Sequence, residues 1–214
     1  SFSSTNNAIT DSGTLAITGV TTLNSGSADI TLDQASSTFG TLAITGANVA
    51  VTENAAMDLG ASTISGTASF SSTNNAITDS GTLAITGATT LNSGSADITL
   101  DQASSTFGTL TLTGANVAVT DAGAADLGTS TVSGTLGITS SGAITDSGTL
   151  AITGDATFTN TLGSNDAITL DDTSNAFSGT VTFATDSGSA VTIVDTTASV
   201  SYTHLTLPTT YGVV

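Results

Sequence analysis

The chain has 214 residues, with 17 acidic residues, neither Lys nor Arg, and a formal net charge of −17. Without basic side chains, backbone hydrogen bonds and apolar packing have to stabilise the fold. Sequence-independent binding to nucleic acid depends on Lys and Arg contacts with phosphates, and an anionic lipid surface repels an acidic protein, so both roles are disfavoured. The absence of Cys excludes disulfides, thiolate metal sites and a thiol nucleophile.

A repeat of 68 residues dominates the sequence. The segment SFSSTNNAITDSGTLAITG occupies residues 1–19 and returns unchanged at 69–87, and the full units 1–68 and 69–136 differ at ten positions. A third, more divergent unit near 137–200 repeats AITDSGTLAITG at 143–154 and carries DAITLDDTSNAFSGTV at 166–181. Self-similarity at a fixed period predicts stacked units, and therefore one β-solenoid over residues 1–200.

Apolar residues alternate with small polar residues inside each unit, which is the period of a strand with one buried face. In chain order, the first unit predicts strands near residues 7–10, 14–18, 20–24, 28–33, 41–45, 48–52, 57–59, 62–65 and 67–71. Nine short strands divide into three turns of three, so we expect a parallel β-helix with about 23 residues per turn. The residues expected to point inward are Leu15, Ile17, Ile30, Leu32, Leu42, Ile44, Val49 and Val51, with Ile98 and Leu100 in the second unit.

The segments TLAITG, NVAVT, GTLTLTG and SGAITDSGTL, rich in Thr, Ala and Gly, resemble the β-strand repeats of filamentous-haemagglutinin-like and autotransporter-type adhesins. The likeness covers about residues 1–200. It implies a right-handed parallel β-helix in an exported protein, located extracellularly or at the bacterial cell surface, that serves as a stalk or adhesive passenger. The likeness is one of strand composition, so no functional residue of those adhesins is carried over.

The last fourteen residues, SYTHLTLPTTYGVV at 201–214, match no earlier segment and hold the only His, the only Pro and both Tyr. They resemble the translated sequencing-adapter tails at the ends of metagenomic reading frames, and we expect no function from them. Pro208 cannot donate to a strand ladder, although Val200, Tyr202, Leu205 and Leu207 could cover an open strand edge. No stretch approaches the roughly 20 apolar residues of a membrane span, so an export signal or anchor is expected outside this segment.

No catalytic site is predicted, and no cofactor. A serine hydrolase needs a His that is oriented by an acid, and the sole His204 lies in the non-repeat tail. Asp171 and Asp172 form the one adjacent acidic pair. On a strand these two side chains would point to opposite faces, instead of converging on a glycosidic bond.

Three acidic turns are the candidates for a metal site: 11–13, 79–81 and 146–148, each reading Asp-Ser-Gly. Oxygen ligands suit calcium. With three turns per repeat, however, equivalent Asp residues would lie roughly 14 Å apart, beyond a Debye length of ~8 Å, and so need no ion between them. We interpret Asp11, Asp79 and Asp146 as solvated turn residues and assign no metal ligand, with a divalent cation as the alternative.

Ice binding would require a flat and regular Thr-x-Thr array. Thr109, Thr111 and Thr113 form the one full set in a strand of this type, because the sister strands at 14–18, 41–45, 82–86 and 149–153 carry Ala at the centre. Their uneven spacing predicts no continuous Thr row. The seven Phe residues are expected in the core, and the Asn pairs at 6–7 and 74–75 are interpreted as turn residues rather than stacked amide ladders.

Taken together, these patterns predict a structural and adhesive stalk segment of a large exported bacterial surface protein. Its expected partners are a host or environmental surface or glycan, or neighbouring repeats, with end-to-end self-association as a further option. The alternative from another class is an ice- or divalent-cation-binding solenoid module. Nucleic acid and membrane insertion are not expected.

Overall fold

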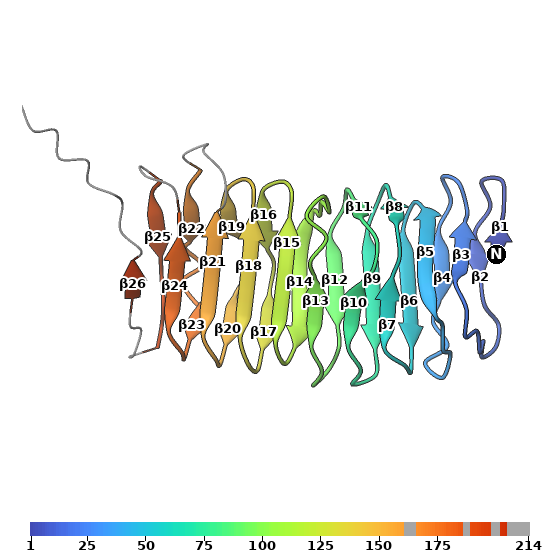
Figure 1. The fold of residues 1–214 in the computed structure, drawn as a ribbon, viewed down its shortest axis with the longest axis horizontal. Coiled ribbons are helices and arrows are strands. Elements are labelled where there is room, and N and C mark those ends of the chain that lie inside the picture. The colour runs from blue at the N-terminus through green and yellow to red at the C-terminus, as the bar shows by residue number, and fades with distance from the viewer. Residues whose placement is uncertain (161–165, 186–188, 198–201, 205–214) are drawn as a thin grey trace, which may run out of the picture.

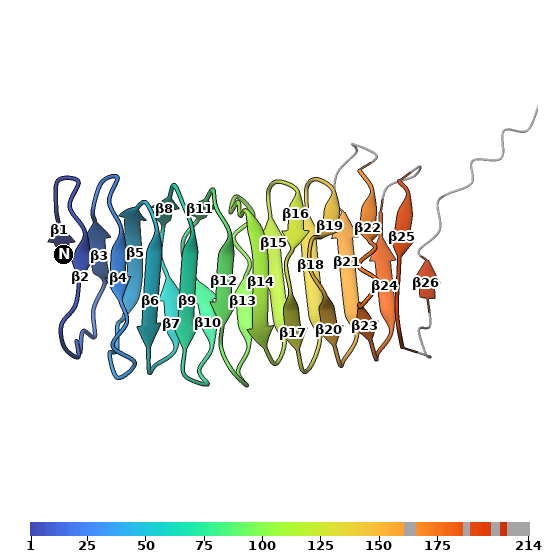
Figure 2. The same ribbon diagram turned by 180° about the vertical axis from the view of Figure 1, so that it is seen from behind.

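The computed structural model describes residues 1–160, 166–185, 189–197 and 202–204, the last three by backbone alone. The chain winds into a rod in which parallel strands stack side by side along the long axis (Figure 1), and the view from behind shows the same stacking on the other side (Figure 2). The predicted all-β parallel solenoid is therefore confirmed. Among the described residues no helix is long and apolar enough to cross a membrane.

Two long parallel sheets form the walls of the rod. Sheet A contains, in spatial order, β1 (Phe2–Ser3), β3 (Thr21–Asn24), β5 (Thr41–Gly46), β7 (Met57–Leu59), β10 (Ile77–Asp79), β13 (Ile98–Leu100), β15 (Val117–Asp121), β18 (Leu136–Ser140), β21 (Ala156–Asn160), β24 (Val181–Ala184) and β26 (Tyr202–His204). Sheet B contains β2 (Ile9–Thr10), β4 (Ile30–Leu32), β6 (Val49–Glu53), β9 (Ala68–Ser72), β12 (Thr89–Asn92), β14 (Thr109–Gly114), β16 (Ala125–Leu127), β19 (Ile144–Asp146), β22 (Ile168–Leu170) and β25 (Val191–Ile193).

A third, shorter strand appears in those turns where one long strand is split by a corner. β5 pairs with both β7 and β8 (Ser62–Ile64), which are separated by a corner at Gly60, and β8 then pairs with β11 (Leu83–Ile85). On sheet B, β14 likewise pairs with β16 and β17 (Ser130–Val132), and β20 (Leu150–Ile152) and β23 (Ala176–Phe177) continue that row. Split turns have the three strands that the sequence predicts, whereas the turn formed by β5 and β6 has two.

Each turn uses about 20 residues, fewer than the predicted 23, because the 68-residue unit makes three and a half turns instead of three. Strands that are equivalent in successive units accordingly lie in opposite sheets. β3, β5 and β7 of the first unit belong to sheet A, and their counterparts β12, β14 and β16 belong to sheet B. Each unit is therefore rotated by half a turn about the rod axis relative to the unit before it.

The core is the space between the walls, filled by every second residue of each strand. Eight of the ten residues predicted to point inward are buried: Ile30, Leu32, Leu42, Ile44, Val49, Val51, Ile98 and Leu100. Leu15 and Ile17 are only partly buried, although their counterparts Leu83 and Ile85 in the second unit are buried. Leu83 and Ile85 lie in β11, which pairs with β8 of the preceding turn, whereas no described strand precedes the turn that holds Leu15 and Ile17.

The Phe residues follow the same rule. Phe39, Phe70, Phe107, Phe158, Phe177 and Phe183 are buried, as predicted, whereas Phe2 is 43% exposed in the first turn. Phe158 packs edge-on against Phe177 and stacks on Phe183. In the tail, residues 202–204 pair with β24 as an added strand, and the remainder of 201–214 lies outside the described residues.

Candidate functional surfaces

The Asp of each repeated Asp-Ser-Gly turn accepts backbone N–H groups from the next turn of the solenoid. The N–H of Asp101 donates to Asp79 Oδ1 at 2.9 Å, and that of Gln102 donates to Asp79 Oδ2 at 3.5 Å. Burial raises the pKa of Asp79, and these two N–H bonds oppose the rise. The equivalent bonds join Asp33 N–H to Asp11 (3.3 Å), and Asp171 and Asp172 N–H to Asp146 (2.9 and 3.3 Å).

The interpretation of these Asp residues as merely solvated turn residues was therefore wrong, since each carboxylate joins two turns. The arrangement of these three Asp residues along the rod also differs from the prediction. Asp79 ends a strand of sheet A, whereas Asp11 and Asp146 lie at the ends of sheet B strands, so successive copies alternate between the two sheets. Among the described residues, no three His, Cys, Asp or Glu side chains lie close enough together to hold a metal ion.

A second set of turn-to-turn bonds lies just before the strands, at the rim where sheet B strands begin in the first unit and at the opposite rim, where sheet A strands begin, in the second unit. Asp29 Oδ1 accepts both the backbone N–H and the side-chain amide of Asn48, at 3.1 and 3.0 Å. Asn48 Oδ1 in turn accepts the N–H and hydroxyl of Thr67, at 3.0 and 3.1 Å. The second unit repeats the network with Asp97, Asn116 and Thr135.

The Asn pairs also connect turns. Asn6 and Asn74 have φ of 58° and 54°, in the left-handed region that Asn tolerates, which confirms their assignment as turn residues. Asn6 Oδ1 additionally accepts the N–H and hydroxyl of Ser27 in the following turn, at 3.0 and 3.2 Å. Facing it, Gly26 has φ of 63°, and a Cβ there would lie 2.3 Å from Asn6 Oδ1. Glycine is thus required at this position for two reasons.

Two carboxylates point into the core, and neither was singled out from the sequence. Glu53 is fully buried; its Oε2 accepts the N–H of Phe39 at 2.8 Å, and its Oε1 has no hydrogen-bond partner. Burial raises the pKa of Glu53 to about 7, and the bond from Phe39 opposes the rise. Burial likewise raises the pKa of the equivalent Asp121, against hydrogen bonds from the N–H groups of Gly123 and Phe107.

Within the part of the chain that the structure describes, Glu53 and Asp121 do not belong to any cluster of three acidic or His side chains, and they lie too far apart to pair with each other. Glu53 ends a strand of sheet B and Asp121 ends a strand of sheet A, and three and a half turns of the solenoid separate the two residues. Asp171 and Asp172 follow β22 in a turn, where Asp172 Oδ1 accepts the N–H of Ser174 at 2.8 Å. The side chain of His204 lies outside the described residues.

The outer faces of the two sheets carry rows of small residues in register. One row on sheet B runs through Thr10, Thr31, Ala50, Ser69, Thr90 and Thr111. A second runs through Thr52, Ser71, Asn92, Thr113, Thr131 and Ala151. The Thr rows are interrupted by Ser, Ala and Asn, which agrees with the expectation that no continuous Thr row forms.

Charge is scarce on these faces. Asp58 and Asp126 are outward-facing acids within the sheets, and each is held by neighbouring hydroxyls. Asp58 Oδ2 accepts from Thr41 Oγ1 at 2.7 Å and from Ser80 Oγ at 2.9 Å, and Asp126 Oδ2 accepts from Thr109 and Ser147 at 2.8 Å each. Both faces therefore offer mainly hydroxyl and methyl groups, while most carboxylates lie at the rims or point inward.

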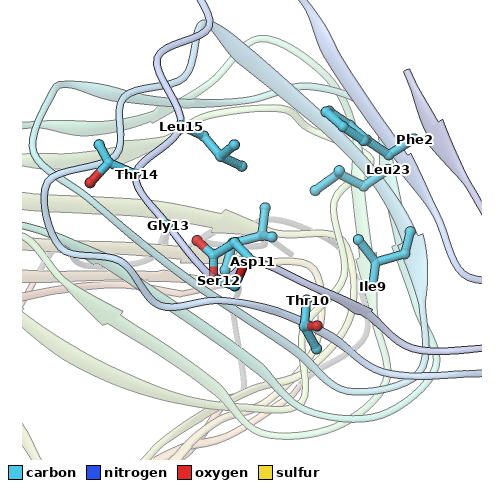
Figure 3. A pocket seen from close by; sticks show the side chains of 10 residues that line it. Phe2, Ile9, Thr10, Asp11, Ser12, Gly13, Thr14, Leu15 and Leu23 are labelled. Carbon is cyan, nitrogen blue, oxygen red and sulfur yellow. The ribbon is translucent and has the colours of Figure 1, made fainter.

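A hollow lies at the first turn (Figure 3). It has a volume of about 370 Å³, and its apolar lining comes from Phe2, Ile9, Leu15, Leu23 and Leu32. Asp11, Ser12, Gly13 and Thr14 form the polar side of the hollow. In Figure 3 the Phe2, Ile9 and Leu23 side chains gather on one side and Leu15 lies across from them. The first turn thus exposes a cross-section of the core.

Sequence reasoning missed the buried carboxylates and the Asn48 network, although both left a signal. In Val49-Ala50-Val51-Thr52-Glu53 the inward alternation of the two Val extends to Glu53, which a strict period of two would have placed inside. Asn48 and Asn116 recur immediately before equivalent strands in two units. The bonds themselves were not predictable, because they depend on which turns become neighbours.

A family model described as repeats of unknown function (DUF5649) matches residues 1–45, 46–113 and 114–184. The complete middle match spans 68 residues, the same length as the repeat in this chain. No curated protein and no solved structure matches the chain.

Proposed function

From the premise that the chain belongs to the DUF5649 family of repeats, we propose that it is a rigid, non-catalytic stalk segment of a large exported bacterial surface protein. The observation that carries this proposal is the use made of polar side chains. The side-chain oxygens of Asp79, Asn48 and Asn6 each accept hydrogen bonds from groups in the next turn, as do those of their counterparts in the other units. The groups that could perform chemistry in this chain instead hold successive turns together.

Rigidity follows from these contacts. Bending the rod would open one rim, and each rim carries carboxylate and amide bonds in addition to the strand ladders. Carboxylate bonds to N–H groups are stronger than bonds between neutral groups, because the acceptor is charged. Such a segment suits the display of a distal domain, or of its own faces, away from a cell surface.

An adhesive role adds the outer faces to this proposal. Their hydroxyl and methyl rows recur through the stacked turns, so that weak contacts to a host or environmental surface or glycan would sum through avidity. Location at the bacterial surface is part of the same proposal, and it draws on the resemblance of the strands to exported adhesin repeats.

Single-molecule stretching tests the stalk. The chain, tethered at both ends, is expected to hold its length at low force and then to lengthen in steps that correspond to one or a few turns. A chain that extends continuously at low force, as a flexible coil does, would contradict the proposal. Beads coated with the intact chain, compared with beads coated with heat-unfolded chain, test adhesion to glycan-coated surfaces separately.

Ice binding is the second candidate, and it rests on one short array where β12 pairs with β14, not on a continuous Thr row. Thr90 and Asn92 lie beside Thr111 and Thr113 in register, which gives a two-row array at the strand spacing of ~4.8 Å. Inhibition of ice recrystallisation by the chain, abolished by Thr111→Asp, would support this function. The candidate Asp residues give less support to the divalent-cation alternative, since each already accepts at least one N–H group from the next turn.

A further inference from the structure

A hollow lies on the outer face of sheet B, well inside the rod and away from both of its ends. Its volume is about 140 Å³, and its side-chain lining includes Asp29, Thr31, Asn48, Ala50, Thr67 and Ser69. Ala50 is the floor of this hollow, because it lies in register between Thr31 and Ser69 and has the smallest side chain of the three. The Ala50 hollow therefore has hydroxyl groups on two sides and the turn-to-turn network of Asn48 on a third.

Several polar groups of the Ala50 hollow are available to a ligand. Asp29 Oδ1 accepts both bonds from Asn48, while no described residue donates to Asp29 Oδ2. The Asn48 amide has two N–H groups and donates one of them to Asp29. The hydroxyls of Thr31 and Ser69 form no hydrogen bond with another described residue. The hollow thus presents both donors and acceptors, two of which are held in place by bonds between turns.

The second unit builds the same arrangement on sheet A. The network recurs there with distances of 3.0–3.1 Å between Asp97, Asn116 and Thr135. Ala118 occupies the floor position, in register between Thr99 and Gly137, on strands that lie side by side (Figure 1). Gly137 stands where the first unit has Ser69, so this surface is more open. Because the units are half a turn apart, the two surfaces lie on opposite faces of the rod.

Gly137 is itself an indication that another molecule contacts this surface. It lies inside β18, where the lack of a side chain weakens a strand. A Cβ at this position would meet only Val117 O, at 3.9 Å, so packing within the rod does not require glycine. Glycine inside a strand is typical of places where a ligand or another backbone approaches closely.

The chemistry of the two surfaces selects an uncharged ligand that is rich in hydroxyl groups. The net charge of −17 repels anions, and each surface holds a single carboxylate, whose Oδ1 is already occupied, to attract a cation. Hydroxyl and amide groups pair with ligand groups that both donate and accept, as sugar hydroxyls do. The volume is below the roughly 300 Å³ of pockets that enclose a whole small ligand, and it suits one ring of a longer chain.

We propose that the Ala50 hollow and its counterpart over Ala118 each bind one sugar ring of a neutral saccharide chain. Asp29 Oδ2 accepts a sugar hydroxyl, the second N–H of Asn48 donates to a sugar oxygen, and the ring lies over Ala50. This inference rests on the adhesive role proposed above and gives it a ligand class and two places of contact. One rod then holds saccharide chains on both of its faces.

Equilibrium dialysis of the intact chain against cellohexaose, maltohexaose and chitohexaose tests the ligand class, with tetragalacturonate and tetralysine as charged comparisons. At least one neutral saccharide should bind, with two molecules per chain at saturation. Its affinity should be the same at ~0.05 and ~0.5 M NaCl, because salt screens only charged pairs. The proposal is overturned if no neutral saccharide binds, or if either charged probe binds more tightly than the neutral ones.

Filling the two surfaces tests their location. Ala50→Val and Gly137→Val introduce a β-branched side chain that strands favour, so circular dichroism and the melting temperature should show an intact fold. Each variant should halve the number of molecules bound, and the double variant should bind about tenfold more weakly or less, because the ligand loses its hydrogen bonds. Ala84→Val is the matched control, since Ala84 is an exposed residue of β11 outside both surfaces. Unchanged binding by the double variant, or an equal loss in Ala84→Val, would overturn the proposal.

Beads coated with these variants separate the sites from the adhesive role on which they rest. Beads that carry the double variant should adhere to glycan-coated surfaces less than beads that carry the intact chain or Ala84→Val. If the double variant adheres as strongly as the intact chain, the adhesive role stands and the two sites are wrong. If intact beads fail to adhere while the chain binds a neutral saccharide in solution and the double variant does not, the sites are right and the adhesive role is wrong.

Discussion

The buried carboxylate of Glu53 predicts that the solenoid loses stability as the pH rises from mildly acidic to neutral. Its pKa lies at about 7 in the folded chain and near 4.5 in an unfolded one. Because the folded state binds the proton more tightly, the contribution to stability is fully present below pH 4.5. It is lost as the pH rises through the interval up to about 7, and it changes no further above that.

The magnitude follows from the difference between the two pKa values. About 2.5 pKa units correspond to ~3 kcal/mol of unfolding free energy between the two ends of the interval. The Asp121 pKa is raised for the same reason and acts in the same direction. Mutual repulsion among the acidic residues also destabilises the folded chain at higher pH, so the effect of Glu53 has to be isolated by comparison with a variant.

Glu53→Gln provides that comparison. The amide keeps an oxygen that can accept the Phe39 N–H, but it carries no titratable charge, so the variant should equal the unaltered chain near pH 4 and exceed it by about 2–3 kcal/mol near pH 8. Urea unfolding followed by circular dichroism across the pH range measures this. Asp33→Asn, which removes one charge from an exposed residue, is the control for net charge.

Parallel pH profiles of Glu53→Gln and the unaltered chain, within about 0.5 kcal/mol, would refute the reasoning. They would mean that the Glu53 carboxylate is as well solvated in the folded chain as in the unfolded one. A drop in stability of Glu53→Gln at every pH would point instead to a cost of burying the amide NH₂ beside the unpartnered Oε1 position, and the slope with pH would still distinguish the two effects.

Four further predictions concern packing, the rim networks, chelation and the C-terminal tail. Phe70→Ala should cost about 3–5 kcal/mol of unfolding free energy, and Phe2→Ala under about 1 kcal/mol, because the same repeat position is buried in one turn and exposed in the other. Asn116→Ala should cost about 1–3 kcal/mol by denaturant unfolding, since it removes the side-chain bond to Asp97 and leaves the Thr135 N–H without its acceptor, while the backbone bond from residue 116 to Asp97 remains. Added EDTA, and removal of residues 201–214, should each shift the melting temperature by less than a few degrees, and a large calcium-dependent rise would contradict the first.

The fold was predictable because its signals are local. Alternation such as Val49/Val51 identifies a strand and its buried face, and the strict repeat shows that strands stack in an array. The number of residues per turn was not predictable in the same way. A corner such as that at Gly60 splits one strand into two without adding a turn, so counting strands and dividing by three gave turns that were too long.

The interactions that join turns were harder to predict from the sequence than the strands were. Asp79 could be recognised as a turn residue, but its acceptance of the Asp101 N–H depends on a partner 22 residues away, at a distance along the chain set by the size of the turn. The separation of such partners along the chain varies from 19 residues between Asp29 and Asn48 to 25 between Asp146 and Asp171, so no single assumed turn length locates them. For the same reason the Asp residues were expected to recur on one side of the rod at every third turn, which the half-turn relation excludes.

The half turn between units has a consequence for any surface role of the repeat. Three and a half turns advance the rod by ~17 Å and exchange sheets A and B, so a patch carried once per unit appears alternately on opposite faces. Thr111 and Thr113 lie on sheet B, whereas their counterparts Ala43 and Thr45 lie on sheet A. Equivalent patches on one face are then two units, or ~34 Å, apart. An array of two units presents each patch once per face, three units present it twice on one face, and four units are needed before both faces carry it twice.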